Sequence, residues 1–403
     1  MRPVGVTGAG TMGAGIAALA TGAGLPTLLY DPDQAALARA PEGPERASDL
    51  DALAPCGLVI EAAPEDVAIK RALFERLAAI VAPDCVLATN TSSLSVTALA
   101  GGLPHPERVV GMHFFNPPAK MRLLEVVAGD ASGAAALAAA RSAGEAMGKH
   151  VIEAADGPGF LVNRCNRPFS LEALRIVQER LATPDQVDRV CRMAGGFRMG
   201  PFELMDLVGI DVGFAVARSF YEQSFGEPRW RPSPLVARLV AAGRLGRKSG
   251  RGWYEYPPGR PADPQPPADV ADADALAGRA GVHLVPPPGR LVEVTTDEAE
   301  QLVTAQGLHA ERVGGPVLGR IVAQLINEAC FALGEGVGSA ADIDAGMVLG
   351  LNHPRGPLEW ADRWGPPAVL ALLDFLHREY GEERYRAAPT LRRAVAERTT
   401  LAA

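Results

Sequence analysis

The chain has few lysines and no concentration of positive charge. Its 403 residues carry 39 Lys+Arg against 47 Asp+Glu, a formal net charge of −8 at pH 7. The complete set of lysines is Lys70, Lys120, Lys149 and Lys248. Because no run of lysine and arginine forms a basic stripe, we do not expect a nucleic acid as the main partner.

Cysteine is also scarce, and its spacing argues against two common uses. The five cysteines lie far apart and form no Cys-x-x-Cys pair; they are Cys56, Cys85, Cys165, Cys191 and Cys330. This pattern indicates buried free thiols in a reducing compartment rather than a disulfide framework or a zinc site. We therefore predict no metal site and a cytoplasmic location.

Charge is absent from residues 3–30, and Arg2 precedes this stretch, which superficially resembles a secretory signal peptide. However, the stretch holds seven glycines between Gly5 and Gly24, so it would make a poor hydrophobic helix. We expect neither export nor a membrane partner.

The glycines instead follow the pattern of a nucleotide-binding loop. An apolar strand over residues 4–7 leads into Gly8-x-Gly10-x-x-Gly13, and a second strand ends at Asp31. Gly8 allows a tight turn, Gly10 lets the backbone approach a pyrophosphate, and Gly13 permits close helix–strand packing. Asp31 can accept hydrogen bonds from a ribose diol and would repel a 2′-phosphate, which favours NAD over NADP.

Strands and helices alternate up to about residue 155, and long helical patterns follow. Alternation predicts an α/β Rossmann domain with a mostly parallel, doubly wound sheet and helices on both faces. The expected strands lie at 58–60, 86–88, 108–113, 123–127 and 150–152, and the expected helices at 64–79, 134–147, 160–179, 185–194 and 213–225.

The helical region contains an internal repeat with a constant offset of 156 residues. Ungapped identity over many positions predicts that an all-α domain occurs twice. The matching pairs include Arg164 and Arg320, Glu172 and Glu328, Asp188 and Asp344, Gly200-Pro201 and Gly356-Pro357, Glu203 and Glu359, Asp206 and Asp362, and Gly209 and Gly365. The predicted domains are residues 1–155, 156–256 and 312–403, with 257–311 as a Pro-rich linker or small connecting module.

A histidine and a glutamate lie on two strands that a short turn connects. His113 ends one strand, Asn116-Pro117-Pro118 breaks the chain, and Glu125 lies in the next strand. If the strands form a hairpin, His113 and Glu125 face each other. A carboxylate on one imidazole nitrogen selects the tautomer and suits a general base. The alternative is a core histidine whose polar atoms are satisfied.

A glycine- and proline-rich segment, Asp156-Gly157-Pro158-Gly159, marks the start of the helical region. Asn163 follows within the first turns of the expected helix, where its amide could donate a hydrogen bond to a substrate oxygen. The alternative is a polar residue that closes the junction between domains.

Together these segments resemble the L-3-hydroxyacyl-CoA dehydrogenase family. The resemblance covers most of residues 1–256, and the order of the motifs makes it highly specific. A second helical copy resembles the duplicated C-terminal domain of longer family members. The motifs are GAGTMGAGIA, NTSSL, GMHFFNP, LLEVV, GPGFLVNR, RMGPFELMDLVG and GRKSGRGWYEY.

The resemblance implies NAD-dependent oxidation of an L-3-hydroxyacyl thioester, in the first place a 3-hydroxyacyl-CoA, to the 3-ketoacyl thioester, or the reverse reduction. It implies that His113 removes the proton of the 3-hydroxyl group, that Glu125 orients His113, and that Ser92 and Asn163 hydrogen-bond the reacting oxygens. The implied NAD contacts are Gly8, Gly10, Thr11, Met12, Gly13, Asp31, Glu65, Lys70 and Asn90.

Two departures from the family pattern leave alternatives open. The second helical copy has Gly319 where the first has Asn163, so we expect it to be structural, within either a monomeric internal pseudo-dimer or a homodimer. Family members commonly carry a protruding helical pair after the second strand, but here residues 32–56 are short and their only cations are Arg39 and Arg46. A carrier-protein-bound acyl thioester is therefore an alternative substrate to acyl-CoA.

Two other classes fit less well. The 3-hydroxyacid dehydrogenase group uses a lysine base, and no lysine lies between Lys149 and Lys248. A non-catalytic NAD-binding protein need not keep the reacting set of Ser92, His113, Glu125 and Asn163.

Overall fold

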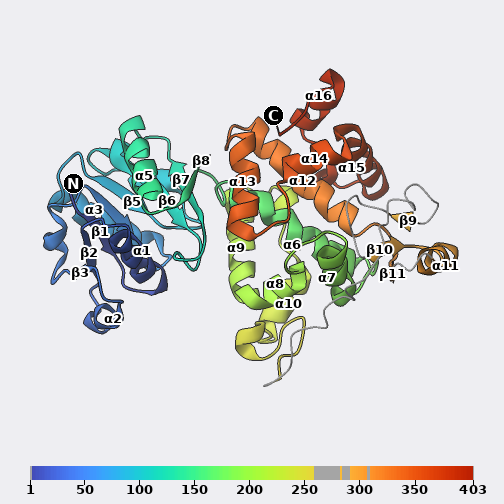
Figure 1. Ribbon diagram of the computed structural model, residues 1–403, viewed down its shortest axis with the longest axis horizontal. Helices are drawn as coiled ribbons and strands as arrows, with labels where there is room; N and C mark the ends of the chain where they lie inside the picture. Colours follow the sequence, from blue (N-terminus) through green and yellow to red (C-terminus); the bar gives the residue numbers. More distant parts are fainter. Residues whose placement is uncertain (1, 258–281, 284–290, 306–308, 403) are drawn as a thin grey trace. The chain divides into compact units, whose positions relative to one another are not determined.

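The computed structural model describes residues 2–257, 282–283, 291–305 and 309–402. Its contacts divide the chain into two compact units (Figure 1). The first unit comprises residues 1–164 and 335–351, and the second comprises residues 165–334 and 352–403. Except for Pro257, the proline-rich stretches at 257–267 and 286–288 lie outside the described residues.

The first unit is built on an eight-stranded sheet with the order β3-β2-β1-β4-β5-β6-β7-β8. All neighbouring strands pair in parallel except β6 and β7, which are antiparallel. The predicted mostly parallel sheet is therefore confirmed. The strands are β1 (Val4–Thr7), β2 (Thr27–Tyr30), β3 (Glu45–Arg46), β4 (Leu58–Glu61), β5 (Val86–Thr89), β6 (Val109–Phe114), β7 (Leu123–Ala128) and β8 (His150–Ala155).

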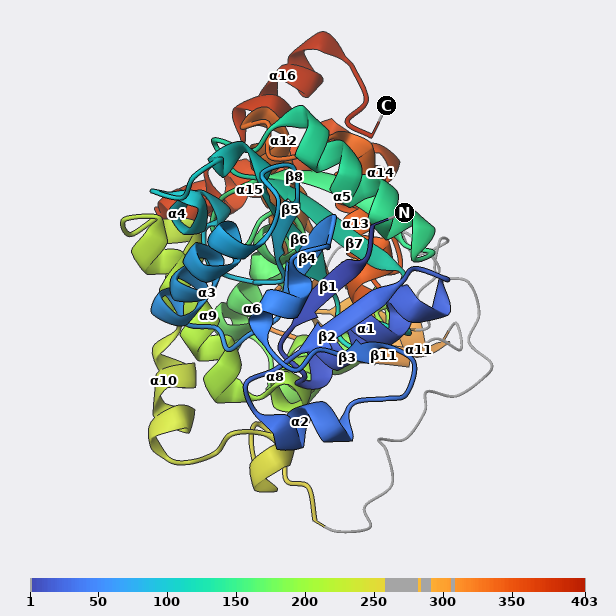
Figure 2. The same ribbon diagram turned by 90° about the vertical axis from the view of Figure 1, so that its left-hand side faces the viewer.

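Helices cover both faces of this sheet, as Figure 2 shows. On one face lie α1 (Thr11–Gly22) and α5 (Ala134–Ala146), whose small side chains pack into one apolar cluster with the strands. On the other face lie α3 (Val67–Ile80) and α4 (Val96–Ala100). Because both faces are covered, the central strands are buried along their whole length, and each is apolar except for its last residue.

Some local elements differ from the expectation. Helix α3 begins at Val67 and not at residue 64, because the Asp66 side chain caps the helix by accepting a hydrogen bond from the Ile69 N–H at 3.0 Å. The segment after β2 forms α2 (Gln34–Arg39), β3 and the 3-10 turn η1 (Leu50–Leu53), which are too short to produce a hydrophobic period.

The second unit is mainly helical, as expected for the C-terminal region. No described helix is long and apolar enough to cross a membrane. Helix α6 (Val162–Gln178) starts in the first unit and continues into the second from residue 165. The other helices are α7 (Pro184–Met193), α8 (Pro201–Val208), α9 (Ile210–Gln223), α10 (Pro234–Ala241), α12 (Leu318–Gly334), α14 (Pro357–Trp364), α15 (Pro366–Tyr380) and α16 (Pro389–Glu397). One further helix, α13 (Ala340–Leu351), belongs to the first unit.

A small three-stranded sheet lies in the second unit, within the segment expected to be a linker or connecting module. Its order is β11 (His309–Arg312), β10 (Leu291–Val294) and β9 (Val282–His283). Helix α11 (Asp297–Ala305) packs on it through a cluster that includes Val292, Val294, Ala299 and Val303.

Candidate active site

His113 and Glu125 are directly opposite each other in the antiparallel β6–β7 ladder, as the hairpin argument predicts. The His113 Nδ1 atom lies 2.6 Å from Glu125 Oε2. Both residues are buried, with exposed fractions of 6% and 0%. Because a carboxylate can only accept, Nδ1 carries the proton and Nε2 keeps a free lone pair.

The second carboxylate oxygen of Glu125 holds the chain where the helical region begins. Glu125 Oε1 accepts hydrogen bonds from the Leu161 N–H at 3.2 Å and the Val162 N–H at 2.9 Å. Both oxygens are thus engaged, so the carboxylate cannot rotate without breaking buried hydrogen bonds. These backbone donors were not predicted, because no side-chain type marks them in the sequence.

Two phenylalanines confine the His113 ring. The ring centroid of Phe115 lies 4.6 Å from that of His113, and the centroid of Phe160 lies 6.0 Å away. Phe160 has a positive φ of 51° in the turn that precedes α6. These contacts add to the carboxylate in orienting the imidazole.

Asn90 links the end of β5 to β6, the strand that carries His113. Its Oδ1 accepts a hydrogen bond from the N–H of Phe114 at 2.9 Å. Phe114 directly follows His113, so the Asn90 side chain helps to hold the end of β6 in place.

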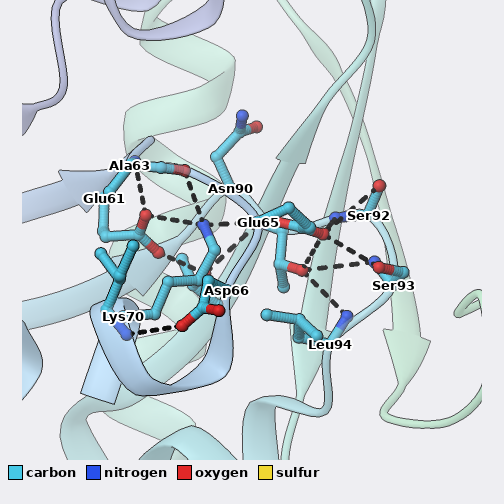
Figure 3. Close-up of polar contacts among 12 residues, drawn as sticks. Glu61, Ala63, Glu65, Asp66, Lys70, Asn90, Ser92, Ser93 and Leu94 are labelled. Carbon is cyan, nitrogen blue, oxygen red and sulfur yellow. Dashed lines mark hydrogen bonds and ion pairs between the residues drawn. The ribbon is translucent and has the colours of Figure 1, made fainter. Parts of the chain in front are cut away.

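A buried lysine joins two acids near the ends of β4 and β5 (Figure 3). The Lys70 Nζ atom lies 2.7 Å from Glu61 Oε1, 3.2 Å from the Ala63 carbonyl oxygen and 3.4 Å from Glu65 Oε2. Glu61 also accepts a hydrogen bond from the Thr89 hydroxyl at 2.7 Å. Glu61 was not predicted as a site residue, although an acid at the end of an apolar strand was a usable signal.

Glu65, in the loop after β4, contacts Ser92, in the loop after β5, and Figure 3 shows the carboxylate facing the serines. Glu65 Oε1 accepts hydrogen bonds from the Thr91 hydroxyl at 2.6 Å, the Ser92 N–H at 3.0 Å and the Ser93 hydroxyl at 3.0 Å. Burial raises the pKa of Glu65, but these donors and the Lys70 charge outweigh it and lower the pKa overall. Glu65 is therefore an ionised group that shapes the loop of Ser92.

The glycine loop has the geometry that a dinucleotide requires. Gly8 has a φ of +98°, and a Cβ atom there would lie 2.6 Å from the Ala62 carbonyl oxygen. At Gly10, by contrast, no heavy atom of the described residues lies within 4 Å of an added Cβ. Gly13 is buried beneath the loop, whereas Thr11 is exposed and Met12 is half-buried in the first turn of α1.

Asp31 binds the backbone of the same loop. Its Oδ2 accepts a hydrogen bond from the Ala9 N–H at 2.6 Å, and its Oδ1 accepts one from the Asp33 N–H at 2.8 Å. Gly10 is the N-cap residue of α1 and provides no side-chain hydrogen bond, so the helix N-terminus retains N–H donors for a pyrophosphate. Open backbone at Gly10, these donors and Asp31 fit an NAD dinucleotide.

Asn163 lies in the first turn of α6 and is half-buried. It directly follows Val162, whose N–H donates to Glu125. Asn163 is thus linked to the His113–Glu125 pair through its chain neighbour Val162, whereas Ser92 is linked to Glu65 and, through Glu65, to Lys70.

Comparison with protein families agrees with this geometry. A model described as 3-hydroxyacyl-CoA dehydrogenase, NAD binding domain, matches residues 3–48 and 44–157. A model described as 3-hydroxyacyl-CoA dehydrogenase, C-terminal domain, matches residues 159–256 and again residues 315–400. The fold and site are those of an NAD-dependent oxidoreductase. The chain belongs to the 3-hydroxyacyl-CoA dehydrogenase family.

Individual relatives extend the similarity over nearly the whole chain. The 3-hydroxyadipyl-CoA dehydrogenase of Escherichia coli strain K12 is 38% identical, and the similarity covers 97% of each chain. A crystal structure of 3-hydroxybutyryl-CoA dehydrogenase from Escherichia coli K12 has a TM-score of 0.89 and 36% identity, covering 98% of this chain and 99% of that one. The 3-hydroxybutyryl-CoA dehydrogenase of Mycobacterium tuberculosis strain H37Rv is 38% identical over 283 residues, 64% of this chain and 99% of its own. The resemblance inferred from the motifs is confirmed.

Proposed function

We propose that His113 is the general base in the NAD-dependent oxidation of an L-3-hydroxyacyl-CoA to the 3-ketoacyl-CoA. The observation that carries this proposal is the buried 2.6 Å contact between His113 Nδ1 and Glu125 Oε2. Nε2 takes the proton of the 3-hydroxyl group, and the resulting imidazolium is stabilised by the Glu125 carboxylate. NAD⁺, held by the glycine loop and Asp31, would supply the acceptor for the hydride from substrate C3. In the reverse direction the imidazolium returns the proton to the oxygen.

Ser92 and Asn163 are the proposed hydrogen-bond partners of the reacting oxygens. Support for Ser92 comes from its loop, which the Glu65 carboxylate organises. Support for Asn163 comes from its neighbour Val162, which is tied to Glu125. Donors held in this way stabilise developing charge without reorganisation.

The proposed NAD contacts are the glycine loop and Asp31, together with Asn90, Glu65 and Lys70. Lys70 is 1% exposed and faces three oxygen acceptors. We therefore assign it an indirect part, in which it holds Glu61 and Glu65 in place.

An absorbance assay of NADH tests the substrate class. We expect the intact chain to reduce acetoacetyl-CoA with NADH, since the family chemistry requires only the thioester and the 3-keto group. The same acyl group on a carrier protein serves as the comparison. Activity on the carrier-bound substrate alone would show that the substrate is an acyl-carrier protein and not an acyl-CoA. Activity on neither substrate would contradict the proposal.

Asp31→Ala is expected to weaken NAD binding by roughly tenfold or more, because the ribose diol loses a charged acceptor. The preference for NAD over NADP should narrow, since the repulsion of a 2′-phosphate is removed. Both effects are measured by titrating each cofactor in the same assay. Asp130→Ala, which changes an exposed aspartate, is the matched control. An unchanged cofactor ratio would exclude Asp31 from the ribose site.

We further propose that the helical domain is duplicated. The bounds of α6 recur in α12 after 156 residues, as do those of α8 in α14. The two matches to the C-terminal family model support the same division, with 156–256 and 312–403 as the two helical domains.

The duplication extends, in our proposal, into the small sheet of residues 282–312. Glu293 pairs with His283 in the antiparallel β9–β10 ladder, as Glu125 pairs with His113. Glu293 accepts hydrogen bonds from the Val317 and Leu318 N–H groups, both at 3.0 Å, at the start of α12. Glu125 has the same arrangement at the start of α6. Without a glycine loop, and with Gly319 at the place of Asn163, this second copy is assigned a structural role.

Contacts between the copies are reciprocal, which supports a pseudo-dimer within one chain. Arg164 forms an ion pair with Glu335 at 2.8 Å, and the equivalent Arg320 forms one with Glu179 at 2.7 Å. We propose that the second copy replaces a partner subunit, so that the chain is a monomer. Light scattering that gives the mass of two chains would favour the homodimer instead.

The five cysteines are free and buried, which fits the proposed cytoplasmic location.

A further inference from the structure

Helix α13, which comes from the second helical copy, packs on the sheet that carries the catalytic pair. Residues 335–351 cluster with residues 1–164 and not with the rest of the second copy. The helix contacts β7 and β8. Its contact residue Leu123 lies two positions before Glu125 on β7, so both side chains are on the same face of the sheet.

Gly346 of α13 touches the residue that donates to Glu125. A Cβ atom at Gly346 would lie 2.8 Å from Val162 Cγ2 and 3.1 Å from Ile152 Cδ1. The Val162 N–H donates to Glu125 Oε1 at 2.9 Å, and Ile152 is the register partner of Glu125 in the β7–β8 ladder. A single methyl group added at Gly346 would therefore collide with Val162, the residue whose N–H donates to the Glu125 carboxylate.

Gly350, one helical turn further along α13, is in contact with Phe115, whose ring packs against the imidazole of His113. A Cβ atom there would lie 2.7 Å from Leu123 Cδ2 and 3.3 Å from Phe115 Cε1. The Phe115 ring in turn packs against the ring of His113, with 4.6 Å between centroids. Both members of the catalytic pair thus have a neighbour that rests on a glycine of α13.

The segment before α13 is anchored to the same region. The Ala155 N–H donates to the Val337 carbonyl oxygen at 2.8 Å, and Arg164 Nη2 lies 2.8 Å from Glu335 Oε2. A Cβ atom at Gly338 would lie 2.8 Å from Leu161 Cδ2, and the Leu161 N–H is the other backbone donor to Glu125. The chain is therefore in close contact with this region from residue 335 to residue 350.

We propose that α13 is a positioning element of the active site, with Gly346 and Gly350 as its positioning residues. The proposal rests on the assignment of His113 and Glu125 as the catalytic pair. The second helical copy then has a function in the reaction although it holds no reacting group. Its helix α13 packs against Val162 and against the Phe115 ring beside the imidazole, and the segment before α13 packs against Leu161. These contacts fix the positions of the ring and of the two residues that donate to Glu125.

Gly346→Ala and Gly350→Ala in the full chain test this role. We expect each to lower kcat by roughly tenfold or more, because small displacements of a catalytic group are costly. NAD binding should be unchanged. The acid limb of the kcat pH profile should move to lower pH, since a displaced carboxylate favours the imidazolium less.

Gly213→Ala is the matched control, because Gly213 lies inside helix α9 and no described atom lies within 4 Å of an added Cβ. Val162→Ala removes the methyl group that the new Cβ would strike, so Gly346→Ala with Val162→Ala should recover kcat and the pH profile toward wild type. Unchanged kcat and pH profiles in both glycine variants would overturn the proposal. So would a loss of folding, seen by circular dichroism, in both variants but not in the control, since the role would then be structural. Normal turnover by His113→Gln would instead indicate that the catalytic assignment had failed.

Discussion

Replacing His113 by glutamine should lower kcat by roughly 10²–10⁴-fold, the usual contribution of a general base. A glutamine can still donate a hydrogen bond to Glu125, but its amide has no group that takes up a proton near neutral pH. The oxidation is measured as the appearance of NADH at saturating substrate. We expect the dissociation constant of NAD to stay close to that of the wild type, because the glycine loop and Asp31 are untouched.

His150→Gln is the matched control for this experiment. His150 begins β8 and is exposed, so its substitution makes the same chemical change at a site away from His113 and Glu125. Near-normal turnover by His113→Gln would falsify the assignment of the base. A comparable loss in the control would point to a general effect on the fold.

Glu125→Gln should lower kcat by about 10²-fold or more, through the tautomer of His113. If the amide oxygen keeps the hydrogen bonds from Leu161 and Val162, the amide N–H₂ group faces His113 Nδ1. Nδ1 must then accept, so the ring proton moves to Nε2, and Nε2 can no longer take a proton from the substrate. The reverse orientation of the amide leaves two backbone donors facing an N–H₂ group, which is costly in a buried site.

Steady-state kinetics compare Glu125→Gln with Glu153→Gln. The comparison separates the effect of the His113 tautomer on kcat from the effect of removing a carboxylate charge from the sheet. Glu153 lies on β8, is exposed and pairs with Arg141 at 2.7 Å, a surface contact of small energetic value. We expect Glu153→Gln to retain wild-type kcat. Equal kcat in the wild type and Glu125→Gln would mean that the carboxylate does not control the imidazole.

The contact between His113 and Glu125 could be predicted because it depends on local geometry. A hairpin with a short connection determines which residues of its two strands are opposite. The positions of His113 and Glu125 in the sequence were therefore sufficient to predict that they face each other. The glycine loop is local in the same sense, since a strand, a turn and a helix follow one another along the chain. Asp31 is found in the same way, because it comes directly after a neighbouring parallel strand.

The support of the pair could not be predicted in this way. The Glu125 carboxylate is held by backbone N–H groups, and every residue except proline has one of these, so residue type carries no signal. The contact between Glu61 and Lys70 also depends on folding, which buries both side chains against each other. The contact of Gly346 with Val162 joins two helices far apart in sequence.

Sequence alone determined the family, the cofactor loop and the facing of His113 and Glu125, because turn geometry and strand register act over a few residues. Tertiary structure decided what surrounds that pair: the α6 backbone donors, the two phenylalanine rings and the glycine face of α13. The physical reason is that packing selects neighbours by shape across the folded chain, and a motif read along the sequence contains no information about which distant surface will fit against it.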